Sequence, residues 1–297
     1  MPLKGWTCPG TRLRVGLDHF DTCTHGPNGR TAASPFFTRL AAQRAREDVR
    51  HSDLRLTATG VLGCPRQLYL DRITDLYPRP ETYAALTRGT ALHAQAAATL
   101  DPEVWSTEAT DPVRHDLVGM IGPYKVSALA DAWRRDLTEI IDFKFPLDWS
   151  VVRRTKDGRA KTDHQVQLNV ERLLLAQQPW AIEAGYNPDT VLLTVHDHAL
   201  GKEEGPLAQA AEHMSAQEIL AYRPGGSRFT FADHAALLVQ IREAHEKLAP
   251  GDTDGQARLA AAIPLVGETM YGGKKCTQYC ALKERCDELV RMFDRPS

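Results

Sequence analysis

Two acidic residues and a lysine in the middle of the chain have the types and spacing of a metal-dependent active site. Asp142 and Lys144 lie two residues apart in the apolar segment Ile-Ile-Asp-Phe-Lys-Phe (140–145), which predicts a buried strand. Residues i and i+2 of a strand point to the same face, so both side chains would enter one site. Asp131 lies near the end of the preceding strand-like segment, and antiparallel pairing would bring it beside Asp142.

Paired carboxylates indicate a divalent cation, because like charges held close repel each other unless a cation compensates them. Such a cation polarises a phosphoryl oxygen and lowers the pKa of a bound water, and a lysine stabilises the negative charge that develops. The alternative is a salt bridge between Asp142 and Lys144 on a surface strand. The flanking Ile and Phe residues argue against it, because a buried ion pair is costly.

Other polar residues could complete this site. His93, on an Ala-rich helix, is a possible further ligand, although such a histidine is more often simply packed or solvated. Gln167 lies on a predicted helix that follows a basic loop, and is by default an ordinary polar helix residue. The basic side chains of that loop form either a solvated surface or a contact to a phosphate backbone. They are Arg153, Arg154, Lys156, Arg159 and Lys161.

Four cysteines suggest a second kind of centre. Cys276, Cys280 and Cys286 form a C-x3-C-x5-C cluster, and Cys64 lies far upstream. Four thiolates can hold zinc or a [4Fe–4S] cluster, which would tie the first helices to the C-terminal region. The alternative is three unrelated thiols in a helical tail.

The N-terminal region carries a further set of possible ligands, Cys8, His19, Cys23 and His25. Zinc accepts two cysteines and two histidines, so a second metal site is conceivable here. The spacing does not match a zinc-finger pattern, and free cysteines in a loop-rich segment are the alternative.

The composition is that of an ordinary globular protein: 297 residues, 42% hydrophobic and 25% charged, with a net charge of −2. This excludes a disordered chain and a disulfide-stapled miniprotein. No apolar run reaches the about 18 residues of a membrane span. We therefore expect a cytoplasmic protein with no membrane partner, whose cysteines stay reduced. Residues 1–60 nevertheless carry nine Lys and Arg against five Asp and Glu, so the near-zero net charge hides basic segments.

The pattern of elements predicts an α/β core with helical flanks. Helices are expected over 34–51, 57–73, 81–100 and 163–176, and 206–265 is expected to be mostly helical with a break at 224–226. Short β-rich segments between 103 and 145 predict an antiparallel meander that leads into a central strand, and 190–197 predicts a further buried strand. This order does not suggest a doubly wound fold.

Six motifs occur in an order that resembles one known family. They are TATGVLGCPRQLYL, RGTALH, ALADAW, IIDFKF, HQVQL and CTQYCALKERC. The chain resembles RecB-like nucleases of the PD-(D/E)XK superfamily, in the branch with a C-terminal iron–sulfur cluster. That branch includes the CRISPR-associated exonucleases and the nuclease domain of AddB. The resemblance runs from about Thr57 to Cys286 and leaves the first 55 residues outside.

The resemblance implies a role for each residue that matches a motif. His93, Asp131 and Asp142 would bind Mg²⁺ or Mn²⁺ together with the backbone carbonyl of Phe143, and Lys144 would position the attacking water.

The same resemblance implies that Gln167 orients the reacting end. Glu171 stands where the family has a tyrosine, which departs from the pattern. The resemblance also implies that four distant cysteines, Cys64, Cys276, Cys280 and Cys286, hold a [4Fe–4S] cluster rather than zinc. The spacing in the resembled family is C-x2-C, where this chain has C-x3-C.

The implied fold is a restriction-endonuclease-like core, a mixed sheet flanked by helices, with a helical iron–sulfur subdomain. The implied nuclease domain spans 56–297 and is closed by the four-cysteine cluster, and 1–55 form an N-terminal extension that could be a small metal-binding module. The implied function is a metal-dependent DNA exonuclease acting on single-stranded ends in recombination and repair, phage replication or CRISPR adaptation. No phosphate-binding loop of a helicase is present, so unwinding would need a helicase partner, and CRISPR adaptation proteins are the other expected partners. The alternative is a non-catalytic, DNA-binding iron–sulfur subunit of a larger complex.

Overall fold

The computed structural model describes residues 4–35, 38–39, 55–73, 91–145, 160–197, 207–273 and 282–293. Among the helices of these residues, none combines the length and the apolar character that crossing a membrane requires.

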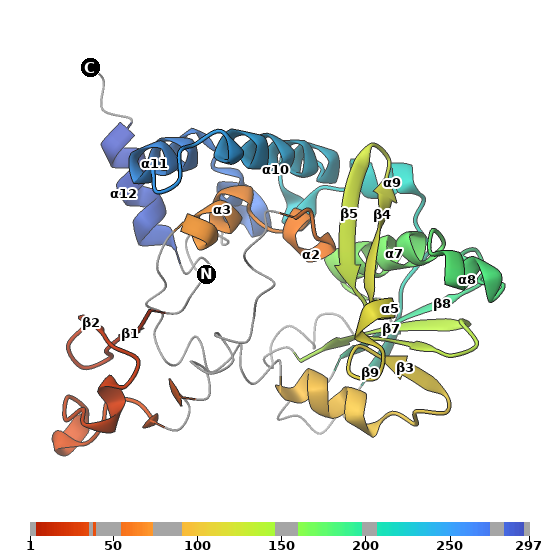
Figure 1. Cartoon of the computed structure of the whole chain (residues 1–297), viewed down its shortest axis with the longest axis horizontal. Helices are drawn as coiled ribbons and strands as arrows, with labels where there is room; N and C mark the ends of the chain where they lie inside the picture. Colours follow the sequence, from red (N-terminus) through yellow and green to blue (C-terminus); the bar gives the residue numbers. More distant parts are fainter. Residues whose placement is uncertain are drawn as a thin grey trace.

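The largest sheet of the described residues has five strands of mixed direction, and Figure 1 draws it at the lower right. Its strands, in spatial order, are β3 (Trp105–Thr107), β6 (Ala132–Arg134), β7 (Glu139–Lys144), β8 (Leu192–Asp197) and β9 (Leu207–Ala210). β7 and β8 are parallel, and every other neighbouring pair is antiparallel. The predicted α/β class, a mixed sheet flanked by helices, is therefore confirmed, and the strand with Asp142 and Lys144 is the central one.

The two faces of β7 meet different surroundings. Ile140 belongs to the main core together with Val166 and Val170 of α7 (Thr162–Leu175). Ile141 and Phe143, which point the other way, lie in a smaller cluster with Ala96 of the helical segment 91–99 and with Leu100 directly after it. By the strand alternation, Asp142 and Lys144 share the face of Ile140 and look toward α7.

A separate hairpin packs on the C-terminal end of α7. β4 (Asp116–Ile121) and β5 (Tyr124–Leu129) pair antiparallel, and the turn between them places Gly122 at φ +58°. The side-chain amide of Gln177 bonds both backbone groups of Met120, with donor–acceptor distances of 2.7 and 2.9 Å. These bonds hold the edge of the hairpin against the helix.

The predicted meander is wrong in its pairing. β3 pairs with β6 rather than with β4, because the short helix α5 (Pro112–His115) intervenes between β3 and β4. Asp111 caps this helix through its side chain, and Pro112 occupies the first turn, where the missing N–H costs nothing.

Helices from both ends of the described chain form a second layer, drawn along the top of Figure 1. They are α2 (Ala58–Val61), α3 (Pro65–Ile73), α10 (Phe231–Glu246), α11 (Thr253–Ala262) and α12 (Lys283–Phe293). α3 contacts both α10 and α11, and α11 contacts α12. A capping box between Thr230 and Asp233 starts α10. Further α-helices among the described residues are α8 (Pro179–Glu183), α9 (Ala216–Ala221) and the helical segment 91–99.

The N-terminal residues form a small unit with a core of its own. It contains β1 (Trp6–Thr7) paired with β2 (Arg14–Val15) and two 3-10 helices, η1 (His19–Asp21) and η2 (Pro27–Gly29). Its buried apolar side chains are Trp6, Cys8, Phe20 and Cys23. Figure 1 draws this unit apart from the central sheet.

Three of the expected elements are present in the structure. The helices over 57–73 and 163–176 and the strand over 190–197 are present as α2, α3, α7 and β8. The region 206–265 is mostly helical, but it begins with the strand β9, which the sequence did not predict. Most of the expected helix over 34–51, and residues 81–90 of the next one, lie outside the described residues.

The buried His115 predicts an acid-sensitive fold. Its ring stacks on Trp133 at 3.6 Å between centroids, Nδ1 lies 2.7 Å from the Ala130 carbonyl oxygen, and Nε2 lies 3.1 Å from Ser106 Oγ. Burial lowers the pKa of His115 from 6.5 to about 4. Between pH 6.5 and pH 4 the His115 imidazole is protonated in the unfolded chain but stays neutral in the native state. The free energy of unfolding therefore falls as the pH drops from 6.5 toward 4.

Urea unfolding of the wild type and of His115→Gln at about pH 7.5 and about pH 4.5 measures this effect. We expect the wild type to be the more stable protein at neutral pH. We expect its advantage to shrink by about 2–3 kcal/mol at the lower pH. An advantage that does not change with pH would contradict the prediction.

Candidate active site

The pair predicted on the central strand lies at the centre of a buried polar cluster. Lys144 Nζ donates to Asp142 Oδ1 at 2.5 Å. The Asp142 side chain is 1% exposed and that of Lys144 is 22% exposed. The lysine therefore reaches from a fully buried carboxylate toward solvent.

Gln167 of α7 connects the members of this cluster. Its Nε2 donates to Asp142 Oδ1 at 3.1 Å and to Glu171 Oε1 at 3.0 Å, and its Oε1 accepts from Lys144 Nζ at 3.2 Å. The amide thus turns its oxygen to the cation and its nitrogen to the two carboxylates, which is the electrostatically favourable orientation.

Asp131 and His93 complete the solvent side of the site. Asp131 directly precedes β6, and because Ala132 pairs with Ile141, Asp131 lies next to Asp142 across the two strands. Asp131 Oδ2 accepts from the backbone N–H of Phe143 at 2.7 Å. His93 Nδ1 lies 3.4 Å from the same oxygen, and the side chains of His93 and Asp131 are 35% and 19% exposed.

The buried charges shift one another strongly. Burial, reinforced by the charge of Asp131, raises the pKa of Asp142 to about 6 in spite of Lys144. Burial and the neighbouring Asp142 raise the pKa of Glu171 well above its usual range. Burial acts against the Lys144 ammonium, but Asp142 and Asp131 outweigh it and raise the pKa of that lysine. Perturbed acids of this kind gather at functional sites.

The cluster has more carboxyl groups than its own cations can compensate. Asp142 Oδ2 and Glu171 Oε2 are buried and have no hydrogen-bond partner among the described residues. Three carboxylates converge on one lysine. Buried unpaired carboxylate oxygens are unfavourable, and oxygen ligands with one imidazole suit a hard divalent cation. The residues present therefore fit a metal ion of this class.

Glu171 belongs to the site, although its sequence position had not predicted a role there. It lies four residues after Gln167, and residues i and i+4 share one face of a helix. That spacing was the available signal. The nucleases that the chain resembles have a tyrosine at this position. Here the position carries a carboxylate, which interacts with Asp142.

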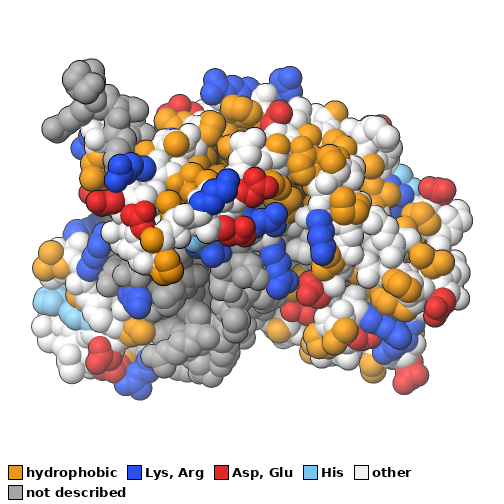
Figure 2. Space-filling view, turned by 45° about the horizontal axis from the view of Figure 1, so that its top comes forward, with side chains coloured by type: hydrophobic (Ala, Val, Ile, Leu, Met, Phe, Trp, Pro, Cys, Tyr) orange, Lys and Arg blue, Asp and Glu red, His pale blue; other side chains and the backbone are white. Residues whose placement is uncertain are grey.

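The predicted phosphate contacts are described only in part. Arg153, Arg154, Lys156 and Arg159 lie outside the described residues. Lys161 is described, and its Nζ lies 3.5 Å from Asp163 Oδ2 and 4.8 Å from the ring centre of Tyr271. It thus interacts within the chain. On the face shown in Figure 2, the described acidic and basic side chains are interspersed among apolar ones.

The four-cysteine centre is likewise described in part. Cys64 is buried just before α3, and Cys286 is half-buried on α12; Cys276 and Cys280 lie outside the described residues. The buried Arg66 of α3 donates to Cys286 Sγ at 3.5 Å and to the carbonyl oxygens of Ala261 and Ile263. α3 and α12 therefore meet beside α11, as closure by these cysteines would require.

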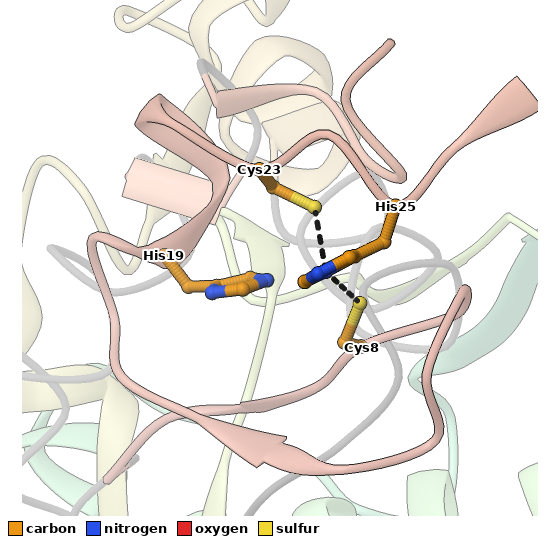
Figure 3. A group of neighbouring side chains, drawn as sticks. All are labelled: Cys8, His19, Cys23 and His25. Atoms are coloured by element: carbon orange, nitrogen blue, oxygen red, sulfur yellow. Dashed lines mark hydrogen bonds between the residues drawn. The ribbon is translucent and has the colours of Figure 1, made fainter. Parts of the chain in front are cut away.

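The structure also brings together the four candidate ligands of the N-terminal unit. The ligand atoms of Cys8, His19, Cys23 and His25 all lie within 4.8 Å of one another (Figure 3).

Comparisons with known proteins give distant structural neighbours. No family model matches the sequence, and no curated protein matches it. One neighbour is the crystal structure of SSO0001, with 13% sequence identity to this chain and a TM-score of 0.43. The match covers 84% of this chain and 96% of that protein. The alkaline exonuclease LHK-Exo from Laribacter hongkongensis has 16% identity and a TM-score of 0.40, and the match covers 74% of this chain and 100% of its own.

Proposed function

We propose that this chain is a metal-dependent deoxyribonuclease of the PD-(D/E)XK type, an exonuclease that hydrolyses phosphodiester bonds at single-stranded DNA ends. One observation carries the proposal: on the central strand a buried Asp142 bonds a half-buried Lys144 beside Asp131 and Glu171, and two buried carboxylate oxygens have no hydrogen-bond partner among the described residues. A salt bridge serving stability alone does not need two further acids around it, because each additional buried charge is unfavourable.

The proposed metal ligands are His93, Asp131, Asp142 and the carbonyl of Phe143. A bound Mg²⁺ or Mn²⁺ would polarise the scissile phosphate and activate water. The Asp131 carboxylate is already fixed by the Phe143 N–H, and the Asp142 carboxylate by Lys144 and Gln167. Both acids are thus held in place before any substrate binds, which favours catalysis.

Lys144 is the proposed catalytic cation. Its ammonium has three donors, and two of them are directed to Asp142 and Gln167. The third is available for the water or for a phosphate oxygen, on the side where the lysine is exposed. Gln167 is a positioning residue in this proposal, because its carbonyl oxygen holds Lys144 in the orientation in which it would face the substrate.

The substrate and partners follow from the same proposal. Single-stranded DNA would contact the site from the side of His93, Asp131 and Lys144, which are the more exposed members. The basic residues of 153–161 would bind its phosphates. A helicase or CRISPR adaptation proteins would act with the nuclease. The division into an extension over 1–55 and a nuclease domain over 56–297 belongs to this proposal as well.

A digestion assay with the full chain tests this function. Single-stranded and duplex oligonucleotides labelled at the 5′ or the 3′ end are incubated with Mg²⁺, Mn²⁺ or EDTA. We expect metal-dependent shortening from one end of the single strand. DNA binding without cleavage under every metal condition would favour the non-catalytic iron–sulfur subunit instead.

We also propose that Cys64, Cys276, Cys280 and Cys286 hold a [4Fe–4S] cluster. The Arg66 bond to Cys286 Sγ is of the kind that adjusts the properties of cluster ligands. Anaerobically purified wild type should have a broad visible absorbance, and Cys286→Ser should lose most of it. The buried apolar packing around Cys64 offers a control, since Val266→Ala should keep the colour. A colourless wild type with stoichiometric zinc would assign these cysteines to zinc.

A further inference from the structure

We infer that Cys8, His19, Cys23 and His25 bind a structural zinc ion that holds the N-terminal unit together. This site is separate from the proposed nuclease site and from the four distant cysteines, and the inference does not depend on either. Figure 3 shows the four side chains pointing toward one another from η1 and the loops beside it.

The distances around His25 are those of a tetrahedral metal site. His25 Nδ1 lies 3.7 Å from Cys8 Sγ and 3.6 Å from Cys23 Sγ. Zinc bonds of about 2.3 Å to sulfur and about 2.0–2.1 Å to nitrogen, at tetrahedral angles, place the two ligand atoms about 3.6 Å apart. One ring nitrogen makes one good hydrogen bond, so its equal approach to two sulfurs is explained better by a cation that all three share.

His19 supplies the fourth corner. Its Nε2 is buried and has no hydrogen-bond partner among the described residues, although such nitrogens are normally paired. The ring stacks against that of His25 with 5.4 Å between centroids and 20° between planes. A zinc ion at the centre of the four side chains would bind this nitrogen and remove the unfavourable burial.

The unit is too small to be stable through its own apolar core. Its buried apolar residues are Trp6, Phe20 and the two ligands Cys8 and Cys23, and its strands are two residues long. Units below about 40 residues usually need a disulfide, a metal or a partner chain. Cys8 and Cys23 are both free, and a disulfide between them would not account for two histidines at the same point.

The backbone holds the first ligand against the last. Cys8 donates its N–H to Leu13 O at 2.9 Å and accepts from Arg12 N at 2.8 Å, which closes a tight loop. A Cβ on Gly10 in that loop would lie 2.2 Å from the carbonyl oxygen of His25, so the two segments are in direct backbone contact. Four protein ligands leave no open position, and this is typical of structural rather than catalytic zinc.

Metal analysis of the full chain tests the inference. We compare wild type, Cys8→Ser and Cys23→Ser, all purified without chelators, with His213→Asn as a matched control, because His213 lies outside the N-terminal unit, where its Nε2 bonds to the Val191 carbonyl. Both cysteine variants should contain about one zinc ion per chain less than the wild type and the control. Cys286→Ser separates this site from the distant cysteines, and it should keep the zinc of the N-terminal unit.

Limited proteolysis keeps the test decisive if the cysteine variants fold poorly. Trypsin cleavage after the exposed Arg12, Arg14 and Arg30 is followed in wild-type protein before and after chelation, and again after zinc is restored. Zinc removal should speed cleavage at these arginines about tenfold or more, and added zinc should reverse the effect. Equal zinc content in wild type and Cys23→Ser, or cleavage that chelation leaves unchanged, would overturn the inference.

Discussion

Lys144→Ala is expected to lower metal-dependent cleavage of single-stranded DNA by about 10²–10³-fold, with little change in DNA affinity. Lys144 is the one cation bonded to both Asp142 and Gln167 among the described residues, and alanine removes the donor that would stabilise the developing negative charge. Its contribution to binding is small, because the basic loop would provide most phosphate contacts. Single-turnover cleavage rates and fluorescence-anisotropy titrations measure the two effects separately.

A matched control and a conservative variant make this result specific. Lys125 of β5 is exposed, so Lys125→Ala removes a lysine from the same domain and should cleave at the wild-type rate. Lys144→Arg keeps the charge with a different geometry, and we expect it to recover only part of the activity. If Lys144→Ala is folded and cleaves as fast as the wild type, the proposed catalytic role is wrong.

The central strand could be predicted because its signal is local. Asp142 and Lys144 lie among Ile and Phe residues, which indicate a buried strand. The alternation of a strand then fixes that both polar side chains share a face. The position of Asp131 beside Asp142 follows from antiparallel pairing of neighbouring strands, which the structure has in β6 and β7.

Features that depend on distant contacts could not be predicted in the same way. β9 has the sequence Leu-Ala-Gln-Ala, whose residues favour helices, and it becomes a strand because it pairs with β8. The side-chain amide of Gln209 in that strand is buried without hydrogen-bond partners among the described residues, and no sequence pattern indicated its burial. Glu171 had a helical spacing from Gln167, but its burial depends on how α7 packs on the sheet.

The proximity of the four N-terminal ligands could not be predicted from the sequence either. The residue types indicated a possible zinc site, whereas the spacing between Cys8 and His25 matched no finger pattern. The loop after β1 and the turn of η1 bring these residues together. Ligand geometry of this kind depends on backbone turns, which the order of residues alone does not determine.

Asp142→Asn is expected to abolish cleavage and the stabilisation by divalent cations without making the metal-free protein less stable. Asparagine keeps an oxygen that can accept from Lys144 and Gln167, as Asp142 Oδ1 does. It replaces the unpartnered Oδ2 by a neutral amide and removes one of three neighbouring carboxylates. The free energy of unfolding without metal should therefore stay the same or rise by about 1 kcal/mol.

Thermal unfolding with and without Mn²⁺ measures both parts of this prediction. The wild type should melt at a temperature a few degrees higher in Mn²⁺, because a ligand that binds the native state stabilises it, whereas Asp142→Asn should not respond. Asp116 of β4 is exposed, and Asp116→Asn should behave like the wild type in melting and in cleavage. If Asp142→Asn still gains stability from Mn²⁺, Asp142 is not a metal ligand, because Asp131 and His93 would then bind the ion without it.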